Sequence, residues 1–352
     1  MRILVTGAAG FIGTNFVRYV LAGRLREVVA RVVAVDLLTY AGNYANLRTC
    51  ADDDRFRFVR ADVADGVAMR AVVAEESIDT VVNFAAESHV DRSIEDHAPF
   101  LHTNVHGVLA LLEAVRDRAG LRRFLQVSTD EVYGSIEQGR VGEDAPTRAS
   151  SPYAASKAAA DAFVQAYATT YGLPVTITRC CNNYGPFQFP EKLIPLFATN
   201  ALDAQPLPLY GDGLHARDWI HVEDHCAALW HLLALEAATG GLFNVSAHDV
   251  RTNREVTELI LQTLDASPSL VRHVQDRPGH DRRYALDASR LRATGWEPTR
   301  SFDEGIAETA RWYREQRAWW EAIRSGEYRD FYERLYGARL RGESPTGEAR
   351  RP

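Results

Sequence analysis

Short apolar runs rich in β-branched residues alternate with longer helical patterns along the first half of the chain. The apolar runs are nearly continuous, which is typical of strands buried on both faces of a parallel sheet. Their alternation with helices predicts an α/β fold, a doubly wound parallel sheet with helices on both faces. The expected strands are 2–6, 32–36, 56–60, 79–83, 123–128 and 174–179, and the expected helices are 11–22, 65–75, 99–119 and 153–171.

The pattern changes in the second half. Proline becomes frequent beyond Gly185, the helical patterns are less regular, and 241–245 (GLFNV) has the composition of a strand that returns to the sheet. We therefore expect a main domain over 1–180 and a smaller lobe over 181–340. This lobe should close over the carboxyl ends of the strands, where open α/β sheets bind ligands. The polar segment 341–352 is expected to be disordered.

Composition excludes several classes of protein. The net charge of -7 does not favour binding to nucleic acid or to an anionic membrane. We expect no signal peptide, because the chain opens directly on a strand and turn, and no apolar run is long enough to span a membrane. The four cysteines form no CxxC pair, so we expect a reduced, cytoplasmic protein without a metal site.

Lysine is nearly absent. Of the 40 basic residues, only Lys157 and Lys192 are lysines, and the rest are arginines. A lysine is usually a solvated surface group, but in this chain arginine provides nearly all of the basic residues. The two lysines are therefore candidates for a function.

A glycine-rich turn follows the first predicted strand and opens the first predicted helix. Glycines at this point allow a tight turn and aim helix N–H groups at a pyrophosphate. Asp36 ends the second strand about 20 residues later, where a carboxylate binds ribose hydroxyls and repels a 2′-phosphate. The alternative is a structural turn with a solvated aspartate, but the complete pattern favours a Rossmann-type NAD site. Its expected residues are Gly7, Gly10, Phe11, Ile12, Gly13, Asp36, Asp62, Val63, Ala85 and Ala86, with Tyr153 and Lys157 at the far end.

Tyr153 and Lys157 lie four residues apart near the start of a predicted helix, so they share one face. A tyrosine that acts as a base near neutrality needs its pKa lowered by roughly 3 units from about 10. The Lys157 ammonium and a positively charged nicotinamide can supply this stabilisation. Thr129, just after the fifth strand, can hydrogen-bond the same substrate oxygen. An amphipathic helix with a core tyrosine is the alternative.

The runs TGAAGFIG and YAASK resemble the extended short-chain dehydrogenase/reductase family, in its sugar-nucleotide modifying branch. The glycines follow the GxxGxxG spacing of that family. The resemblance implies that the chain is an NAD-dependent enzyme.

Two adjacent carboxylates, Asp130 and Glu131, follow Thr129. Buried carboxylates are costly unless they are satisfied or used. Elimination of water from C5 and C6 of a hexose needs a base and an acid, and a carboxylate pair with separated pKa values can provide both. Acidic residues also favour helix starts, so the sequence alone leaves a structural role open. By resemblance, Glu131 is the base and Asp130 the acid.

Longer motifs extend the resemblance over nearly 1–340. They are 85–93 (AAESHVDRS), 179–195, 211–224 and 276–287, and together with TDEVYG they resemble the dTDP-glucose 4,6-dehydratases. This resemblance implies dTDP-glucose as substrate and a homodimer formed through helices 99–119 and 153–171. The substrate-binding residues that it implies are Ser88, Asn182, Glu191, Lys192, Leu193, Pro208, Tyr210, Arg217, Asn253, His280 and Tyr284.

Within that set, Asn182 is expected at the sugar, and Glu191, Lys192 and Leu193 along the sugar–pyrophosphate channel. Pro208 and Tyr210 would flank the thymine. Arg217, Asn253 and His280 would hold the diphosphate, which Lys192 and Arg217 can neutralise. An ordinary salt bridge for Arg217 and a surface position for His280 are the alternatives.

Other functions remain open at this point. A dehydratase of UDP- or GDP-sugars and a sugar-nucleotide 4-epimerase would use the same NAD site. An NAD-sensing binding protein would keep the fold without the chemistry. The Asp130–Glu131 pair favours dehydration, and the presence of Tyr153 and Lys157 beside it favours an enzyme.

Overall fold

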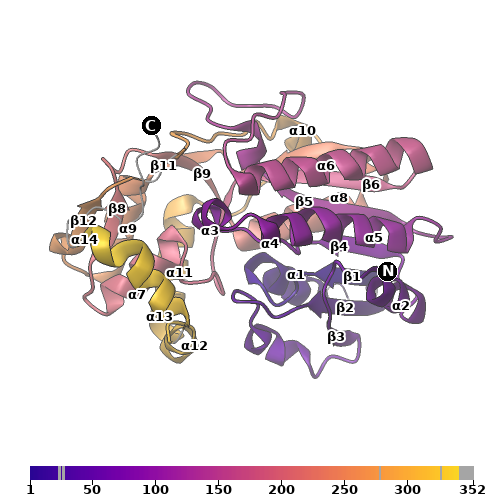
Figure 1. The fold of residues 1–352 in the computed structure, drawn as a ribbon, viewed down its shortest axis with the longest axis horizontal. Helices are drawn as coiled ribbons and strands as arrows, with labels where there is room; N and C mark the ends of the chain where they lie inside the picture. The colour runs from indigo at the N-terminus through magenta and orange to yellow at the C-terminus, as the bar shows by residue number, and fades with distance from the viewer. Residues whose placement is uncertain (23–24, 26–27, 277–278, 326, 341–352) are drawn as a thin grey trace.

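Seven parallel strands form the central sheet, which lies in the right half of Figure 1. The computed structural model describes residues 1–22, 25, 28–276, 279–325 and 327–340. The sheet order is β10-β6-β5-β4-β1-β2-β3. The strands are β1 (Arg2–Thr6), β2 (Arg31–Asp36), β3 (Phe56–Arg60), β4 (Thr80–Asn83), β5 (Arg123–Thr129), β6 (Val175–Cys180) and β10 (Leu242–Val245). The α/β doubly wound fold expected from the sequence is therefore confirmed.

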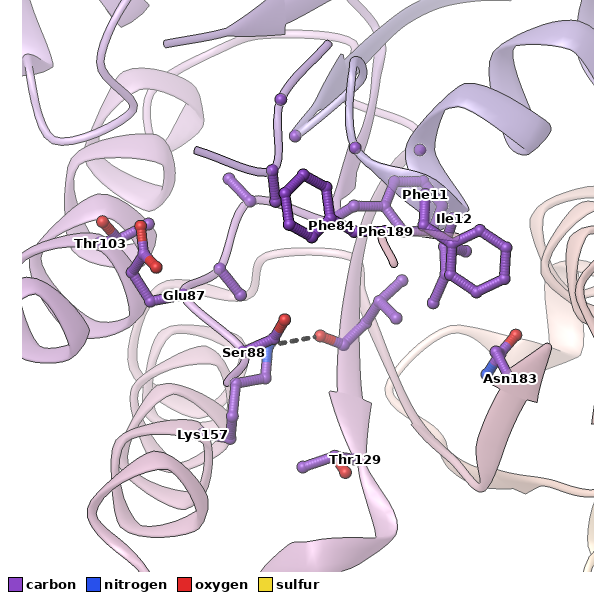
Figure 2. A pocket seen from close by; sticks show the side chains of 18 of the residues that line it. Phe11, Ile12, Phe84, Glu87, Ser88, Thr103, Thr129, Lys157, Asn183 and Phe189 are labelled. Carbon is purple, nitrogen blue, oxygen red and sulfur yellow. Dashed lines mark hydrogen bonds between the residues drawn. The ribbon is translucent and has the colours of Figure 1, made fainter. Parts of the chain in front are cut away.

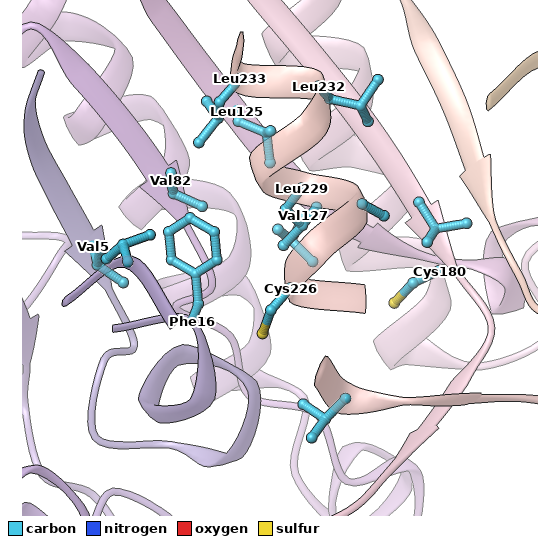
Figure 3. Close-up of a cluster of buried hydrophobic side chains, with 14 of the residues drawn as sticks. Val5, Phe16, Val82, Leu125, Val127, Cys180, Cys226, Leu229, Leu232 and Leu233 are labelled. Carbon is cyan, nitrogen blue, oxygen red and sulfur yellow. The ribbon is translucent and has the colours of Figure 1, made fainter. Parts of the chain in front are cut away.

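Helices cover both faces of this sheet because side chains alternate along each buried strand. In β1, Ile3 and Val5 belong to the apolar cluster on one face, whereas Leu4 belongs to the cluster on the other. The helices α1 (Phe11–Leu21) and α8 (Val222–Ala234) cover the first face, where Phe16 and Leu229 meet the strands (Figure 3). The second face is covered by α2 (Gly66–Glu75), α5 (Gly107–Val115) and α6 (Pro152–Tyr171).

The helical stretch expected over 99–119 is present but ends earlier and contains a π-turn. It consists of α4 (Ala98–Phe100), a π-helical turn η3 (Leu101–His106) and α5, which ends at Val115. A π-turn contains one more residue than an α-turn and redirects the side chains within it. Here it includes the buried Asn104, which donates to the Glu87 carbonyl oxygen at 3.0 Å and to Ser156 Oγ at 2.8 Å. The turn thereby joins the loop after β4 to α6.

The second half of the chain builds a smaller lobe at the left of Figure 1. Its three-stranded sheet has the order β11-β9-β7, and β8 pairs with β12. Its strands are β7 (Asn182–Tyr184), β8 (Leu207–Tyr210), β9 (Ala216–His221), β11 (Asp249–Thr252) and β12 (Val271–Val274), and its main helices are α7 (Leu193–Leu202), α9 (Asn253–Leu264), α11 (Phe302–Glu315) and α12 (Arg317–Ile323). Tyr184, Phe197, Trp219, Tyr313 and Trp320 are among the large side chains of its separate core.

Shorter elements connect these units. They are α3 (Val90–Glu95), α10 (Ser289–Arg292), α13 (Glu327–Tyr332), α14 (Ala338–Leu340), the 3-10 helices η2 (Tyr44–Cys50), η4 (Asp130–Tyr133), η5 (Glu236–Ala238) and η6 (Pro268–Leu270), and a second π-helical turn η7 (Glu333–Gly337). The strand expected at 241–245 is β10, which pairs with β6 at the edge of the main sheet. The segment 341–352, for which we expected disorder, lies outside the described residues.

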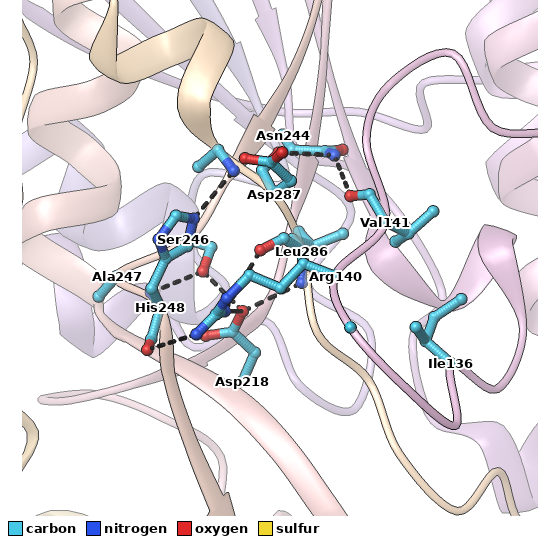
Figure 4. A network of polar contacts seen from close by, with 12 residues as sticks. Ile136, Arg140, Val141, Asp218, Asn244, Ser246, Ala247, His248, Leu286 and Asp287 are labelled. Atoms are coloured by element: carbon cyan, nitrogen blue, oxygen red, sulfur yellow. Dashed lines mark hydrogen bonds and ion pairs between the residues drawn. The ribbon is translucent and has the colours of Figure 1, made fainter.

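A buried polar network joins the lobe to the main sheet (Figure 4). The carboxylate of Asp218 on β9 accepts hydrogen bonds from Ser246 Oγ at 2.6 Å and from the Leu286 backbone at 3.1 Å. Arg140, from the segment between β5 and α6, lies 3.6 Å from the same carboxylate. The network therefore fixes β9 against the loop that follows Asp130 and Glu131.

In the part of the chain that the structure describes, no helix is both long and apolar enough to cross a membrane.

Candidate active site

A cavity of about 310 Å³ opens where the main-sheet strands end at their carboxyl side (Figure 2). All of the residues predicted for the cofactor and the chemistry line this cavity, together with some of those predicted for the substrate. These residues are Gly7, Gly10, Phe11, Ile12, Gly13, Asp36, Asp62, Val63, Ala85, Ala86, Ser88, Thr129, Asp130, Glu131, Tyr153, Lys157, Asn182, Glu191 and Lys192. One cavity thus combines the glycine turn, the Tyr–Lys pair and the two adjacent carboxylates.

The turn after β1 has no room for side chains. Gly7 has a φ of +62°, and a Cβ there would lie 2.7 Å from the Ala85 backbone nitrogen. A Cβ on Gly13 would lie 2.2 Å from the Gly7 carbonyl oxygen. Helix α1 begins after Gly10, which provides no side-chain cap, and its first turn carries no acidic residue. The first N–H groups of α1 are therefore available to an anion in the cavity.

Asp36 lies at the end of β2, and its carboxylate is held by the neighbouring backbone. Oδ2 accepts a hydrogen bond from the Ala9 N–H at 2.9 Å, and Oδ1 accepts one from the Leu38 N–H at 2.7 Å. Burial raises the pKa of Asp36, although these hydrogen bonds oppose the shift. Gly42 passes so close that a Cβ would lie 2.6 Å from Asp36 Oδ1. The carboxylate is consequently fixed at the cavity wall.

Asp62 follows β3 and contacts an imidazole. His102 Nε2 lies 2.8 Å from Asp62 Oδ2, and the Ala64 N–H donates to Oδ1 at 2.8 Å. Burial favours a higher pKa, but these two hydrogen bonds lower the pKa of Asp62 overall. The carboxylate is therefore ionised and oriented.

Tyr153 and Lys157 occupy the first two turns of α6. Ser151 caps this helix by accepting a hydrogen bond from the Ala154 N–H at 3.1 Å, and a proline follows at the first helical position. Lys157 is buried and donates from Nζ to the Val127 carbonyl oxygen at 2.7 Å (Figure 2). Burial lowers the pKa of Lys157, and the nearby Asp161 carboxylate opposes this shift.

The protein's own groups do not lower the pKa of Tyr153. Burial and the Glu131 carboxylate raise it well above its usual value, and a hydrogen bond with Thr129 acts in the opposite direction. The sequence predicted that the pKa of Tyr153 would be lowered by Lys157 and by a positively charged nicotinamide. The groups of the protein alone do not produce this lowering, so it requires the charge of the cofactor in addition to Lys157.

The two adjacent carboxyl groups have different environments. Asp130 is buried, and its Oδ2 has no hydrogen-bond partner among the described residues. Burial, the Glu131 charge and the Asp218 charge raise the pKa of Asp130 well above its usual value. Glu131 is only half-buried. The surroundings of Asp130 accordingly favour its protonated form.

Arg217 and Tyr284 lie outside the cavity lining but act on this pair. The Arg217 guanidinium lies 4.4 Å from the centre of the Tyr284 ring. The Arg217 charge lowers the pKa of Asp130, whereas burial and then the Glu131 charge raise the pKa of Tyr284. Both residues therefore border the carboxylates from the second lobe.

Several residues of the cavity wall carry a buried oxygen atom that has no hydrogen-bond partner among the described residues. These atoms are Ser128 Oγ, Asp130 Oδ2, Asn182 Oδ1, Gln188 Oε1 and Glu191 Oε2. Glu191 Oε1 accepts one from the Tyr40 hydroxyl at 3.1 Å, and burial raises the pKa of Glu191 to about 7. Buried acceptors are normally satisfied, so this set favours a ligand with several hydroxyl groups.

The remaining predicted substrate residues are not in the cavity lining. Leu193 opens α7 and packs against the lobe's apolar core. Pro208 and Tyr210 are on β8, Asn253 opens α9, and His280 follows β12. Tyr210 and His280 do lie together, with ring centres 6.0 Å apart. The structure thus forms a second group of predicted residues in the lobe, beyond the cavity.

Several residues that line the cavity were not predicted from the sequence. Glu87 is the most notable, because burial raises the pKa of its carboxyl group, and Figure 2 shows it beside Thr103. Its position one residue before Ser88, in a motif already recognised, was the signal that could have identified it. The others are Leu37, Thr39, Ala41, Gly42, Ala61, Phe84, Thr103, Val127, Ser128, Cys180, Cys181, Asn183, Gln188 and Phe189.

Comparisons with known proteins agree with this geometry. The family model described as GDP-mannose 4,6 dehydratase matches residues 4–309. A dTDP-glucose 4,6-dehydratase of Streptomyces niveus is 49% identical over 327 residues, which cover 92% of this chain and 96% of the relative. The chain belongs to the dTDP-glucose 4,6-dehydratase family, in the extended short-chain dehydrogenases/reductases. The family expected from the sequence is thereby confirmed.

Solved structures give the same picture. The dTDP-glucose 4,6-dehydratase DesIV of Streptomyces venezuelae, with NAD bound, has a TM-score of 0.88 and 51% identity, covering 92% of this chain and 100% of that one. A UDP-glucose 4-epimerase of Thermus thermophilus, in complex with NAD, has a TM-score of 0.82 and 33% identity, covering 90% and 100%. The fold is thus common to dehydratases and epimerases, and the site must distinguish them.

Proposed function

We propose that this enzyme converts dTDP-glucose to dTDP-4-keto-6-deoxyglucose. The reaction oxidises C4, eliminates water across C5 and C6, and then returns the hydride to C6 and a proton to C5, so no external oxidant or reductant is consumed. The observation that carries the proposal is the pairing of Asp130 with Glu131 beside Tyr153. Asp130 is buried with a raised pKa, and Glu131 is half-buried, so one cavity offers an acid and a base.

The cofactor is NAD, and the residues present fit it. The uncapped start of α1 suits the pyrophosphate, because its first N–H groups have no acceptor within the helix. Asp36 suits the ribose hydroxyls, and Asp62 with Val63 suits the adenine. Ala85 and Ala86 border the path to Tyr153 and Lys157. When bound, NAD supplies the hydride acceptor and donor.

Tyr153 removes the proton of the C4 hydroxyl, and Thr129 hydrogen-bonds the same oxygen. Lys157 places a positive charge in the cavity wall, where its hydrogen bond to Val127 fixes its position. The C4 ketone that results makes the C5 proton acidic, so oxidation precedes elimination.

Glu131 then takes the C5 proton, and Asp130 gives a proton to the departing C6 hydroxyl. The assignment follows the environments of the two groups. Burial and neighbouring negative charges raise the pKa of Asp130 and so favour its protonated form, which is the form that a general acid needs. An epimerase that only exchanges hydride and proton at C4 has no use for this pair.

We assign the rest of the substrate to the second lobe and to the loop after β4. Ser88, Asn182, Glu191 and Lys192 line the cavity and are assigned to the sugar, and Leu193 and Tyr284 are assigned to the same part of the substrate. Arg217, Asn253 and His280 are placed for the diphosphate, and Pro208 and Tyr210 for the thymine. In an acidic protein, these local positive groups provide the charge that a diphosphate needs.

We further infer that the enzyme acts in the cytoplasm as a homodimer. Phe163 and Tyr171 on α6 and Leu101 on η3 expose 38%, 51% and 50% of their surface. Large apolar side chains on neighbouring helices suit a helix-to-helix interface between two copies.

Incubation with dTDP-glucose tests the proposal. A product with the alkaline chromophore of a 4-ketosugar is expected from the wild-type enzyme, and little from Tyr153→Phe. Separate incubations with UDP-glucose and with GDP-mannose test the specificity of the enzyme for the nucleotide part of the substrate. Formation of dTDP-galactose instead of the ketosugar would identify an epimerase.

A further inference from the structure

Two histidines of the second lobe are stacked face to face. The rings of His215 and His280 have centroids 3.9 Å apart and planes that differ by 9°. His215 immediately precedes β9, and His280 follows the end of β12, so residues distant in the sequence form this pair. The side chains of His215 and His280 are only 6% and 7% exposed.

Both rings contact the same carboxylate. His280 Nδ1 lies 2.7 Å from Asp276 Oδ1, at hydrogen-bond distance, and His215 Nε2 lies 3.1 Å from Asp276 Oδ2. Because His280 Nδ1 is hydrogen-bonded to Asp276, a contact between His280 and a phosphate would use Nε2, on the other edge of the ring.

Two histidines and an aspartate also suggest a metal site, but their arrangement does not suit one. The potential ligand atoms lie within 4.8 Å of one another. An imidazole binds a metal along the nitrogen lone pair, in the plane of the ring. Since the two rings are nearly parallel and stacked, an ion in the plane of one ring would lie out of the plane of the other.

The charges around His215 are mixed in sign. Arg217 and Arg282 lie close enough to lower the pKa of His215, after burial as the largest cause, while Asp276 and Asp212 act in the opposite direction. Arg282 is engaged with Asp212 at 2.8 Å.

His215 also contacts Asn253, another residue that we assign to the diphosphate. The His215 carbonyl oxygen accepts a hydrogen bond from the Asn253 N–H at 2.8 Å, and Arg217 is two residues further along the chain. His215 Nδ1 is buried and makes no hydrogen bond among the described residues. A neutral ring satisfies this position better than a charged one, which would bury an unpaired N–H.

We propose that His215 is a positioning residue of the diphosphate site, which acts by stacking under His280 and, with Asp276, fixing the orientation in which His280 meets the substrate diphosphate. The inference rests on the proposed function. His215 itself does not touch the substrate, and its effect passes through His280. A side chain that only supports the fold would show no such dependence on His280.

A double-mutant cycle tests this dependence. The variants are His215→Ala, His280→Ala and the double variant, with His231→Ala as the control, because the His231 ring contacts Thr294 and not this group. Coupling between residues in contact is typically 0.5–3 kcal/mol, so we expect His215→Ala to weaken dTDP binding about 10-fold. KM for dTDP-glucose should rise similarly, with kcat within about twofold of wild type.

In the His280→Ala background, the same His215→Ala change should have no further effect on dTDP affinity. His215→Gln, which keeps a planar donor, should recover part of the affinity, and it replaces His215→Ala in the cycle if the alanine variant does not fold. An equal loss with and without His280, or a fall in kcat at unchanged KM, would overturn the proposal. Calorimetry with dTDP needs no turnover, so a wild-type enzyme inactive on dTDP-glucose would contradict the proposed function without deciding the role of His215.

Discussion

Lys192 donates a hydrogen bond from its ammonium group to the Ser88 carbonyl oxygen at 2.8 Å. Lys192 precedes α7 of the second lobe, whereas Ser88 lies in the loop after β4 of the main sheet. The contact therefore joins the two parts of the chain across the cavity that both residues line. It also places one of only two lysines at the site, as the composition led us to expect.

Replacement of Lys192 by methionine should weaken substrate binding more than it slows the chemistry. The change removes both a positive charge near the diphosphate and the hydrogen bond to Ser88. A charge-assisted hydrogen bond contributes roughly 1.5–3 kcal/mol, so KM should rise about 10- to 100-fold. Steady-state kinetics with dTDP-glucose measures this effect. Lys192→Arg, the matched control, should retain part of the affinity, and an unchanged KM in Lys192→Met would remove Lys192 from the site.

Asp130 should control the alkaline side of the pH–rate profile. Its pKa is raised by burial and by the charges of Glu131 and Asp218. The protonated form of Asp130 is the active one. It is fully present at acid pH, and activity should be lost as the pH rises through the raised pKa. Asp130→Asn cannot donate this proton. Turnover should fall about 10²- to 10⁴-fold, and the alkaline limb due to this group should disappear.

Asp130→Asn should nevertheless leave exchange of the C5 proton measurable, because Glu131 is retained. Proton NMR in deuterated water separates the two steps. A variant that kept wild-type turnover with the same alkaline limb would show that another group is the acid.

Glu131→Gln should allow oxidation at C4 but block the elimination at its first step, the removal of the C5 proton. Tyr153, Thr129 and Lys157 remain, so C4 oxidation should still occur and reduced cofactor should be visible by its absorbance. Loss of the base should nearly abolish solvent deuterium incorporation at C5, with turnover reduced about 10²- to 10⁴-fold. Glu137→Gln, at an exposed position a few residues further on, is the matched control. Near-normal turnover of Glu131→Gln would exclude Glu131 from the mechanism.

Much of this site could be predicted because its motifs are local. The turn 7–13, the Tyr153–Lys157 spacing and the Thr129–Glu131 run are each set by neighbouring residues. The strands that carry them were evident as continuous apolar runs. All of these side chains line one cavity because parallel strands present their carboxyl ends at the same edge of the sheet.

The parts that could not be predicted depend on contacts between distant segments. The π-turn at Asn104 follows from its hydrogen bonds to Glu87 and Ser156, which no helical pattern in 99–119 reveals. The stacking of His215 on His280 likewise requires the lobe to be folded. The pKa of Asp130 is raised first by burial and then by the charges of Glu131 and of Asp218, and the burial and the Asp218 contribution both require distant segments to pack together.

The choice between NAD and NADP should depend on Asp36. Its carboxylate is fixed by the N–H groups of Ala9 and Leu38 and cannot move away from a 2′-phosphate. After removal of bound cofactor, NAD should restore turnover and NADP should restore far less. Asp36→Asn should reduce the ratio of activity with NAD to activity with NADP about 10-fold, because the repulsion between one carboxylate and the 2′-phosphate is lost. Equal activation of the wild-type enzyme by NADP would contradict the role given to Asp36.

The path of the hydride provides the last prediction. Tyr153 and the carboxylate pair line the same cavity, and in the proposed mechanism one nicotinamide serves both C4 and C6 of the same sugar. In the role proposed for them, Lys192 and Arg217 would hold the rest of the substrate and keep the intermediate bound while the sugar shifts slightly. dTDP-glucose deuterated at C4 should therefore give a product with deuterium at C6 of the same molecule. In a mixture of fully labelled and unlabelled substrates, mass spectrometry should detect no crossover. Loss of the deuterium to water would rule out the proposed return to C6, and its recovery only at C4 would indicate an epimerase.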